Sequence, residues 1–393
     1  MTTDCKSAPD SFVAPHVAEL PKSGIREFFD IVSGRKDVIS LGIGEPDFRT
    51  PWHIREQAIV ALEQGATRYT ANLGMPSLRQ AIAEYTERSF KAKYDWRNEI
   101  LVTVGVSEAF DVALRAVLSP GDEVLYHEPC FVAYAPLVRL AHGVPVPVRT
   151  FRKDNFRVTV EELERHVTPR TKAMLLNFPN NPTGATLTKQ DTEELADFAI
   201  RHNLVVISDE VYSELTYEGG RNSMAMVERL RDRLIFLNGF SKAWSMTGFR
   251  LGYTCAPAGI TDAMMKIHQY CMMSAPTVSQ HAGLEAVRHG DNDIVEMRES
   301  YRRRRNFIVA SLNEMGLDCF MPNGAFYVFP SIQSTGMTSR DFAVRLLNDY
   351  AVACVPGGAF GSCGEGFLRC SYATGMDQLK EAMQRMREFL KRG

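Results

Sequence analysis

Short apolar runs alternate with amphipathic segments along most of this chain. Each run holds about five aliphatic or β-branched residues, which is typical of a buried strand. Between the runs, apolar residues recur at intervals of three and four, which predicts helices, for example over 107–118 and 189–202. The predicted strands are 100–104, 123–127, 144–148, 173–177, 204–208 and 234–238.

Strand and helix alternate from about residue 54, which predicts an α/β fold with a mostly parallel sheet between helices on both faces. After about residue 283 the rhythm changes to a long charged helix, a short apolar segment (GAFYVF), a second helix, AVACV and a terminal helix. This pattern predicts a smaller α+β domain. The first 45 residues are too few to form a domain and are expected to join it. We therefore predict a large domain over 46–283 and a small domain over 1–45 and 284–393.

Composition excludes several classes of protein. The chain has 393 residues and a net charge of -2, which argues against a nucleic-acid binder, and we interpret the basic run at 302–305 as a solvated helix face. Eight cysteines without a CxxC pair or zinc spacing predict no metal site and a reducing cytoplasm. No apolar stretch approaches the length of a membrane span, and the N-terminus lacks an apolar signal region, so no membrane association is expected.

Chemically useful residues follow four of the predicted strands. Because ligands bind beyond the carboxyl ends of the strands in open α/β sheets, these residues are expected to meet at one edge. Each has an ordinary alternative, since Asn-Pro makes turns, Asp caps helices and most loop lysines are solvated. The four strand ends deliver a glycine turn with Val106 and Ser107, the amide of Asn181 in NFPNNPTG, the carboxylate of Asp209 with Tyr212 nearby, and the amine of Lys242.

The chemistry of these groups is mutually consistent. A helix that opens after Gly105 offers free N–H groups for a phosphate, and Arg250 adds a charge-assisted contact. A lysine in a partly apolar pocket near another cation has a lowered pKa and acts as an amine nucleophile. Asp209 would keep a pyridine nitrogen protonated, while Asn181 and Tyr212 hydrogen-bond a phenolate. Phosphate, aldehyde, pyridinium and phenolate together predict pyridoxal 5'-phosphate, held by Lys242 as a Schiff base.

Three motifs, NNPTG, SDEVYSEL and SKAWSMTGFRLGY, resemble in order and spacing the class I/II aminotransferases of the aspartate aminotransferase fold (fold type I). The resemblance continues through LGIGEPDF, GAFYVFPS, PGGAFG and GFLRCSY, so it covers essentially the whole chain. The segments IHQYCMMSAPTVSQHAGLEAV and QSTGMTSRDFAVRLL look most similar to a bacterial branch of aspartate and N-acetyl-LL-diaminopimelate aminotransferases.

The resemblance implies a role for each candidate residue. Lys242 is the Schiff-base lysine, Asp209 pairs with the pyridinium, Asn181 and Tyr212 bind the phenolate oxygen, and Phe131 stacks on the ring. Arg369 grips the substrate α-carboxylate, with Gly44 close to it and Asn181 beside it. The phosphate contacts are Val106, Ser107, Arg250 and, from the partner subunit of a homodimer with shared sites, Tyr69. The chain departs from the family at Gly239, where a phosphate-binding Ser is frequent, which leaves Ser241 or the backbone to compensate.

The implied activity is transfer of an amino group between an L-amino acid and a 2-oxo acid, expected to be 2-oxoglutarate, by a ping-pong reaction. Aspartate and N-acetyl-LL-diaminopimelate are the candidate donors, and a pyridoxal-phosphate-dependent β-lyase on the same fold is the alternative. A transcription regulator with an aminotransferase-like sensor would need a DNA-binding domain ahead of it, for which the 40-odd leading residues leave no room. A nicotinamide dehydrogenase would need GxGxxG after a strand, and no strand here is followed by it.

Overall fold

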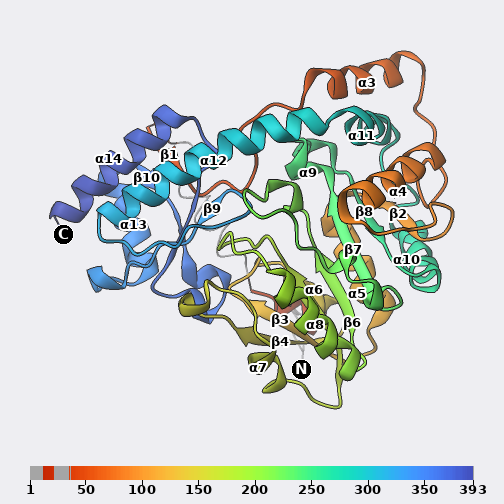
Figure 1. The fold of residues 1–393 in the computed structure, drawn as a ribbon, viewed down its shortest axis with the longest axis horizontal. Helices are drawn as coiled ribbons and strands as arrows, with labels where there is room; N and C mark the ends of the chain where they lie inside the picture. The colour runs from red at the N-terminus through yellow and green to blue at the C-terminus, as the bar shows by residue number, and fades with distance from the viewer. Residues whose placement is uncertain (1–11, 22–34, 36, 393) are drawn as a thin grey trace, which may run out of the picture.

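The structure, a computed structural model, describes residues 12–21, 35 and 37–392, and in these residues a seven-stranded sheet forms the centre of the molecule (Figure 1). The strands lie in the order β2-β8-β7-β6-β5-β3-β4. Strand β8 runs in the direction opposite to the other six, so its pairs with β2 and β7 are antiparallel and the remaining pairs of this sheet are parallel. The fold class is therefore the predicted one. The strands are β2 (Ile100–Thr103), β3 (Glu123–Glu128), β4 (Val144–Arg149), β5 (Thr171–Asn177), β6 (Val205–Asp209), β7 (Leu234–Gly239) and β8 (Gly252–Cys255).

All six strands expected from the apolar runs are present, with ends that shift by at most two residues. The seventh strand, β8, was not predicted, because its four residues, Gly-Tyr-Thr-Cys, contain no Val, Ile or Leu and so form no aliphatic run. Its pairing with β2 and β7 on both sides supplies the order that its own composition does not.

Side chains along each central strand alternate between two apolar layers, as the pleat requires. On β7, Leu234 and Phe236 pack in one layer, whereas Ile235 and Leu237 pack in the other. Helices α4, α8 and α11 contribute to the first layer and α5, α6 and α10 to the second. The helices of this part are α3 (Trp52–Glu63), α4 (Pro76–Phe90), α5 (Gly105–Val117), α6 (Tyr134–Leu140), α7 (Val160–Glu164), α8 (Lys189–Arg201), α9 (Phe240–Ala243), α10 (Ala258–Cys271) and α11 (Thr277–His289).

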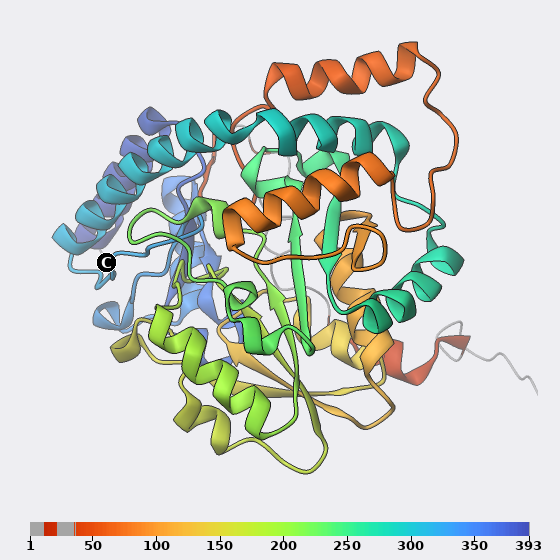
Figure 2. The same ribbon diagram turned by 45° about the vertical axis from the view of Figure 1, so that its right-hand side comes forward.

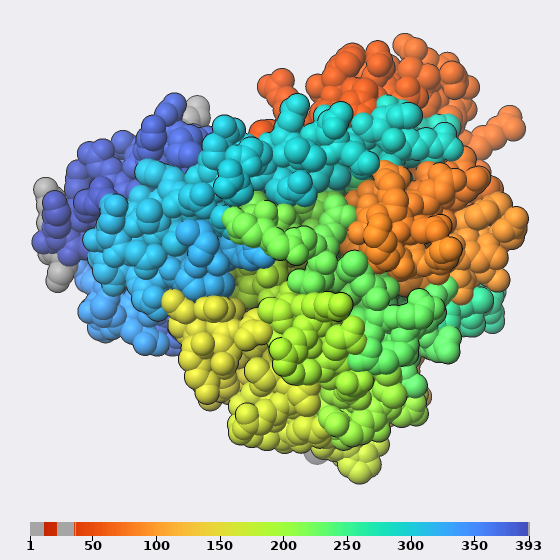
Figure 3. All heavy atoms as spheres, viewed as in Figure 1, coloured from red at the N-terminus to blue at the C-terminus, as the bar shows by residue number. Residues whose placement is uncertain are grey.

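The C-terminal third forms a second apolar core. Figure 3 shows this part of the chain, in cyan to blue, gathered on one side of the molecule. Its antiparallel strands follow the order β11-β12-β9, and β1 pairs in parallel with β10, so residues 39–40 lie beside residues 352–353. The predicted domain boundaries at 45/46 and 283/284 stay a prediction. The elements are β1 (Ile39–Ser40), α12 (Asp291–Glu314), β9 (Tyr327–Val328), α13 (Ser339–Tyr350), β10 (Val352–Ala353), β11 (Val355–Pro356), β12 (Leu368–Ser371) and α14 (Met376–Arg392).

Helix α3 lies outside this double layer, over α11 and the start of α12, whereas the short helix α1 (Pro15–Ala18) lies well away from it, at the right-hand edge of the view in Figure 2. His53 attaches α3 to both neighbours, because its Nδ1 lies 2.8 Å from Oε1 of Glu285 and its Nε2 lies 3.0 Å from Oδ2 of Asp293. None of the helices in the described ranges is both apolar enough and long enough to cross a membrane.

The basic run at 302–305 is not the fully solvated helix face that we expected. Arg304 and Arg305 are buried, and each forms a bidentate ion pair: Arg304 with Asp47 at 2.8 Å and Arg305 with Glu218 at 2.6 and 2.8 Å. The expectation was wrong for these two because a continuous run of like charges hides the helical period, which turns two of the four inward. Arg304 thereby anchors the segment that precedes α3.

The long helix α12 allows a direct test of the second core. Leu312 is fully buried there, whereas Val295 on the same helix is 51% exposed. We expect Leu312→Ala to lower the free energy of unfolding by about 2–5 kcal/mol, because it removes buried methyl groups and leaves a cavity. Val295→Ala should change it by less than about 0.5 kcal/mol. Urea unfolding of the two variants measures the difference, and equal losses would contradict the packing described.

Candidate active site

The carboxyl ends of the central strands and the N-terminus of α5 enclose a cavity of about 350 Å³. It combines residues from β5, β6, α5 and α9 with residues from the N-terminal segment and from β9 and β12. Every predicted site residue except Tyr69 lines it, namely Gly44, Val106, Ser107, Phe131, Asn181, Asp209, Tyr212, Ser241, Lys242, Arg250 and Arg369.

Lys242 stands at the end of β7, on the single turn of α9. Its Nζ donates to the carbonyl oxygen of Gly44 at 2.6 Å and lies 5.8 Å from the ring centroids of Tyr212 and Phe326. The pKa of the amine is lowered to about 8, chiefly because the group is removed from water; the carboxylates of Glu45 and Asp209 oppose this shift, and the guanidinium groups of Arg369 and Arg250 assist it. A large fraction of this lysine is therefore a neutral amine at mildly alkaline pH.

Asp209 is the last residue of β6 and is buried at the floor of the cavity. Burial raises the pKa of its carboxyl, which hydrogen bonds and the charge of Lys242 oppose. Tyr134 donates its phenol to Oδ2 at 2.7 Å, and the backbone N–H of Val211 donates to Oδ1 at 3.2 Å. The side-chain amide of Asn177, at the end of β5, donates to the backbone carbonyl of Asp209 at 3.0 Å and joins the two strand ends.

Helix α5 opens directly into the cavity. No side chain among the described residues caps it. The backbone N–H groups of its first turn, which includes Val106 and Ser107 of the cavity lining, are therefore free to bind an anion. Gly105 has φ +74°, and a Cβ there would lie 2.6 Å from Nη2 of Arg250, so the guanidinium sits directly over the glycine. The helix N-terminus and Arg250 thus converge on one point.

The geometry at Gly239 explains the departure from the family pattern. Its backbone is extended, with φ -172°, so the glycine is not needed for conformational reasons. A Cβ at this position would lie 2.7 Å from Cγ2 of Val106 and 3.1 Å from the carbonyl oxygen of Leu251. Val106 therefore fills the space that a serine side chain would take, and Ser241 supplies a hydroxyl to the cavity instead.

Arg369, on β12, is buried between the rings of Tyr327 and Phe360, whose centroids lie 4.8 and 4.9 Å from its Cζ. Its Nη1 donates to Oδ1 of Asn181 at 3.1 Å, and its Nη2 donates to the carbonyl oxygen of Gly42. Its buried Nε has no partner among the described residues. The two rings restrict the guanidinium, which lines the cavity and can bind a carboxylate as a planar fork.

Two tyrosines that line the cavity, Tyr134 and Tyr327, were not predicted as site residues. Tyr134 follows Phe131 by three residues in EPCFVAY, and a turn in which its N–H donates to the carbonyl oxygen of Phe131 at 3.2 Å brings the two rings to 5.7 Å and 82°. Tyr327 lies in GAFYVF, and its hydroxyl is 2.8 Å from that of Tyr212. An aromatic three residues from a predicted stacking ring was the available signal for Tyr134, whereas nothing in the sequence pairs Tyr327 with Tyr212.

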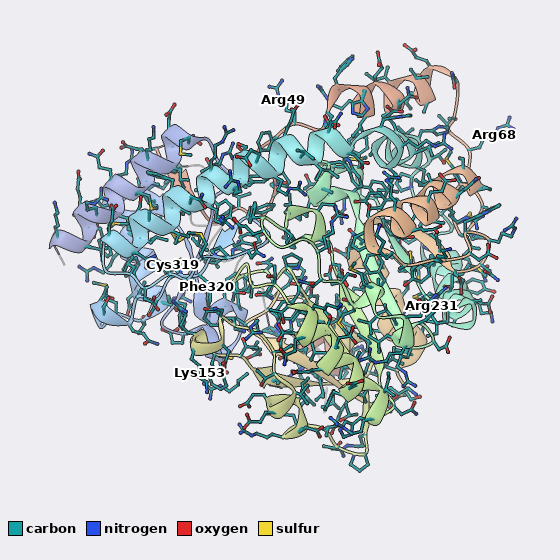
Figure 4. The ribbon with its side chains drawn as sticks, viewed as in Figure 1. Arg49, Arg68, Lys153, Arg231, Cys319 and Phe320 are labelled. Atoms are coloured by element: carbon teal, nitrogen blue, oxygen red, sulfur yellow. The ribbon has the colours of Figure 1, made fainter. Side chains whose placement is uncertain are left out.

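Tyr69 lies outside this cavity and is 79% exposed. Its neighbours are fixed by side chains of α11, because Thr277 donates to the carbonyl oxygen of Arg68 at 2.7 Å and Gln280 donates to the hydroxyl of Thr70 at 3.0 Å. Arg68 points outward at the edge of the molecule in Figure 4. Within one chain, Tyr69 is therefore presented to the outside on an ordered loop.

The donor set fits pyridoxal 5'-phosphate. A neutral amine can bond an aldehyde, the helix N-terminus with Arg250 suits a phosphate, and a buried carboxylate suits a pyridinium. The cleft also holds the hydroxyl of Tyr212 for a phenolate and the ring of Phe131, 36% exposed, for stacking. The Lys242 amine, with its lowered pKa, is the observation that makes the fit specific for an aldehyde rather than any phosphate ester.

Comparison with known proteins agrees with this geometry. The family model described as aminotransferase class I and II matches residues 36–386. The chain is 48% identical to an aspartate aminotransferase of Pyrococcus abyssi, over 94% of this chain and 96% of the other, and 46% identical to aromatic-amino-acid aminotransferase 2 of Thermococcus litoralis, over the same shares. The crystal structure titled Pyrococcus protein-A1 superposes with a TM-score of 0.94 at 47% identity, covering 96% of this chain and 98% of that one.

The lowered pKa of Lys242 predicts how cofactor loading depends on pH. Only the neutral amine attacks an aldehyde, so the rate at which cofactor-free protein takes up pyridoxal phosphate should rise about tenfold per pH unit below the pKa of about 8 and level off above it. The growth of a borohydride-fixable adduct between roughly pH 6 and pH 10 measures this rate. A rate that kept climbing to the upper end, as for a solvated lysine, would contradict the assignment.

Proposed function

The chain belongs to the class I and II aminotransferases, and from this premise we propose that it transfers the amino group of aspartate or N-acetyl-LL-diaminopimelate to 2-oxoglutarate in a ping-pong reaction. That it is a pyridoxal-phosphate-dependent transferase follows from the family. The observation that carries the proposal is the amine of Lys242, lowered in pKa, in one cavity with the carboxylate of Asp209 and the guanidinium of Arg369.

The bound cofactor supplies an aldehyde for the amino group and a conjugated ring that accepts electron density from the substrate. Arg369 binds the α-carboxylate, and the substrate oxygens replace Asn181 and Gly42 as its acceptors. With the cofactor bound, the neutral amine of Lys242 would take the proton from the substrate Cα as general base. Asp209 would hold a proton on the ring nitrogen, and Tyr212 and Asn181 would hydrogen-bond the phenolate oxygen.

The active unit in this proposal is a homodimer with shared sites. Exposed apolar side chains support it, because Tyr270 is 86%, Met272 48% and Met273 45% exposed at the end of α10. The loop that carries Tyr69 joins this patch through Asn72, which donates to the carbonyl oxygen of Met273 at 2.8 Å. A second copy seated on this surface would cover the patch and bring Tyr69 to its phosphate site.

Two further points support the proposal. The relatives reported above are aminotransferases, which does not favour the β-lyase alternative. All cysteines in the described part of the chain are free thiols, and Cys354 and Cys370 stay unlinked although their sulfurs lie 3.4 Å apart, which suits a reducing cytoplasm.

A donor screen with 2-oxoglutarate tests the function. Aspartate, N-acetyl-LL-diaminopimelate and aromatic amino acids are compared by the glutamate that each produces, while pyruvate plus ammonia without an oxo acid would identify a β-lyase.

Lys242→Ala should lose at least about a thousandfold in kcat, because no other amine in the cavity can take the Cα proton. Near wild-type turnover by Lys242→Ala would overturn the assignment.

Mixing two inactive variants tests the shared site. If each site combines Lys242 of one chain with Tyr69 of the other, a hybrid dimer of Lys242→Ala and a disabling Tyr69 variant has one site with both defects and one with neither. Co-refolding should then recover about half of the wild-type activity per hybrid dimer, as independent sites require. If both residues came from one chain, verified hybrids would show no recovery.

A further inference from the structure

We propose that Tyr134 is a positioning residue for the reaction, whose phenol orients the Asp209 carboxylate toward the cofactor ring and favours its ionised form. This inference rests on the proposed role of Asp209. Tyr134 forms no hydrogen bond with Arg369 or Lys242 among the described residues, and the partner of its phenol is Asp209.

The contact is short and sequestered from water. Both side chains are buried, with Tyr134 2% and Asp209 7% exposed, and the Oη–Oδ2 distance is 2.7 Å. In the described part of the chain, the donors to this carboxylate are the phenol of Tyr134 on one oxygen and the N–H of Val211 on the other. A buried carboxylate satisfied on both oxygens is fixed in rotation, so its remaining lone pairs face the cavity.

The phenol is itself held in place. Tyr134 is the first residue of α6, and its ring packs against Phe110 at 4.9 Å and against Phe131 at 5.7 Å. Burial and the Asp209 charge raise the pKa of the phenol well above its usual value, so it stays a donor throughout the working pH range. The same packed ring therefore supports the predicted stacking residue, Phe131, and the carboxylate.

The balance of charge around Asp209 gives this donor its importance. Burial favours the neutral carboxyl, and the Tyr134 hydrogen bond is the largest effect opposing it, followed by the Val211 N–H and the charge of Lys242. The other titratable groups near the pair are Tyr212 after β6, Cys130 beside Phe131, and His127 on β3, which accepts from the backbone N–H of Asn177. None of these three side chains hydrogen-bonds the Asp209 carboxylate in the described part of the chain, whereas Tyr134 does.

Tyr134→Phe tests the inference, because it removes the hydroxyl and keeps the ring contacts. Tyr85→Phe is the matched control, since Tyr85 is equally buried and donates to a buried carboxylate, Glu214, at 2.6 Å, outside the cavity lining. Both variants should lower the melting temperature by similar amounts. The first readout is independent of turnover and is the pH at which the visible absorption of the bound cofactor changes.

We expect Asp209→Asn to move that pH upward, because loss of the carboxylate charge leaves the ring nitrogen less protonated and the conjugated group more basic. Tyr134→Phe should move it in the same direction by a smaller amount, and Tyr85→Phe should leave it unchanged. The kcat of Tyr134→Phe near neutral pH should fall about tenfold to hundredfold, the range for a hydrogen bond to a charged group, with a smaller change in KM for the donor. This deficit should shrink as the pH rises and Asp209 ionises, whereas that of Asp209→Asn should not.

The outcomes separate this inference from the proposed function. If Asp209→Asn moves the absorption change and Tyr134→Phe behaves like Tyr85→Phe, the role of Tyr134 is overturned while the role of Asp209 stands. If Asp209→Asn moves neither the absorption change nor kcat, the role of Asp209 fails and this inference fails with it.

Discussion

The site depends on keeping charged groups out of water without neutralising them. Lys242, Asp209 and Arg369 all line one cavity, and burial disfavours the charged form of each. The protein meets this cost with specific partners. Asp209 accepts hydrogen bonds from a phenol and a backbone N–H. Lys242 donates to a backbone carbonyl oxygen. Arg369 packs against aromatic rings and donates to the side-chain amide oxygen of Asn181. The pKa of the lysine is lowered to about 8 chiefly because burial disfavours its charged form, an effect that the nearby carboxylates of Glu45 and Asp209 only partly offset.

The parallel sheet makes this arrangement possible. Strands β5, β6 and β7 are neighbours in the sheet, so their carboxyl ends deliver Asn177, Asp209 and the turn with Lys242 side by side. The interiors of β5, β6 and β7 alternate between two apolar layers, and the polar side chains of these strands stand at or next to the strand ends. The position of the cavity is thus a consequence of the same hydrophobic pattern that forms the core.

That relation explains how much the sequence could predict. The apolar runs located six strands, and the polar residues that follow them located the cavity lining, because both are local features of the chain. Strand β8 was not predicted because its extended conformation depends on pairing with a strand on each side. The burial of Arg304 and Arg305 was not predicted because a run of like charges shows no helical period. Tyr134 and Tyr327 escaped for a third reason: their hydroxyls meet Asp209 and Tyr212 across more than seventy residues of chain.

The N-terminal segment connects this chemistry to the rest of the molecule. The carbonyl oxygen of Gly44 accepts from Lys242, that of Gly42 accepts from Arg369, and Asp47 is held by the buried guanidinium of Arg304. A Cβ at Gly44 would lie 2.9 Å from the hydroxyl of Tyr327, so backbone rather than side chain occupies this edge of the cavity. Two of these three cations, Lys242 and Arg369, are the groups proposed to bind cofactor and substrate. Loading the site must therefore exchange these backbone acceptors for ligand atoms, while the Arg304 ion pair, which takes no part in the chemistry, keeps the segment attached.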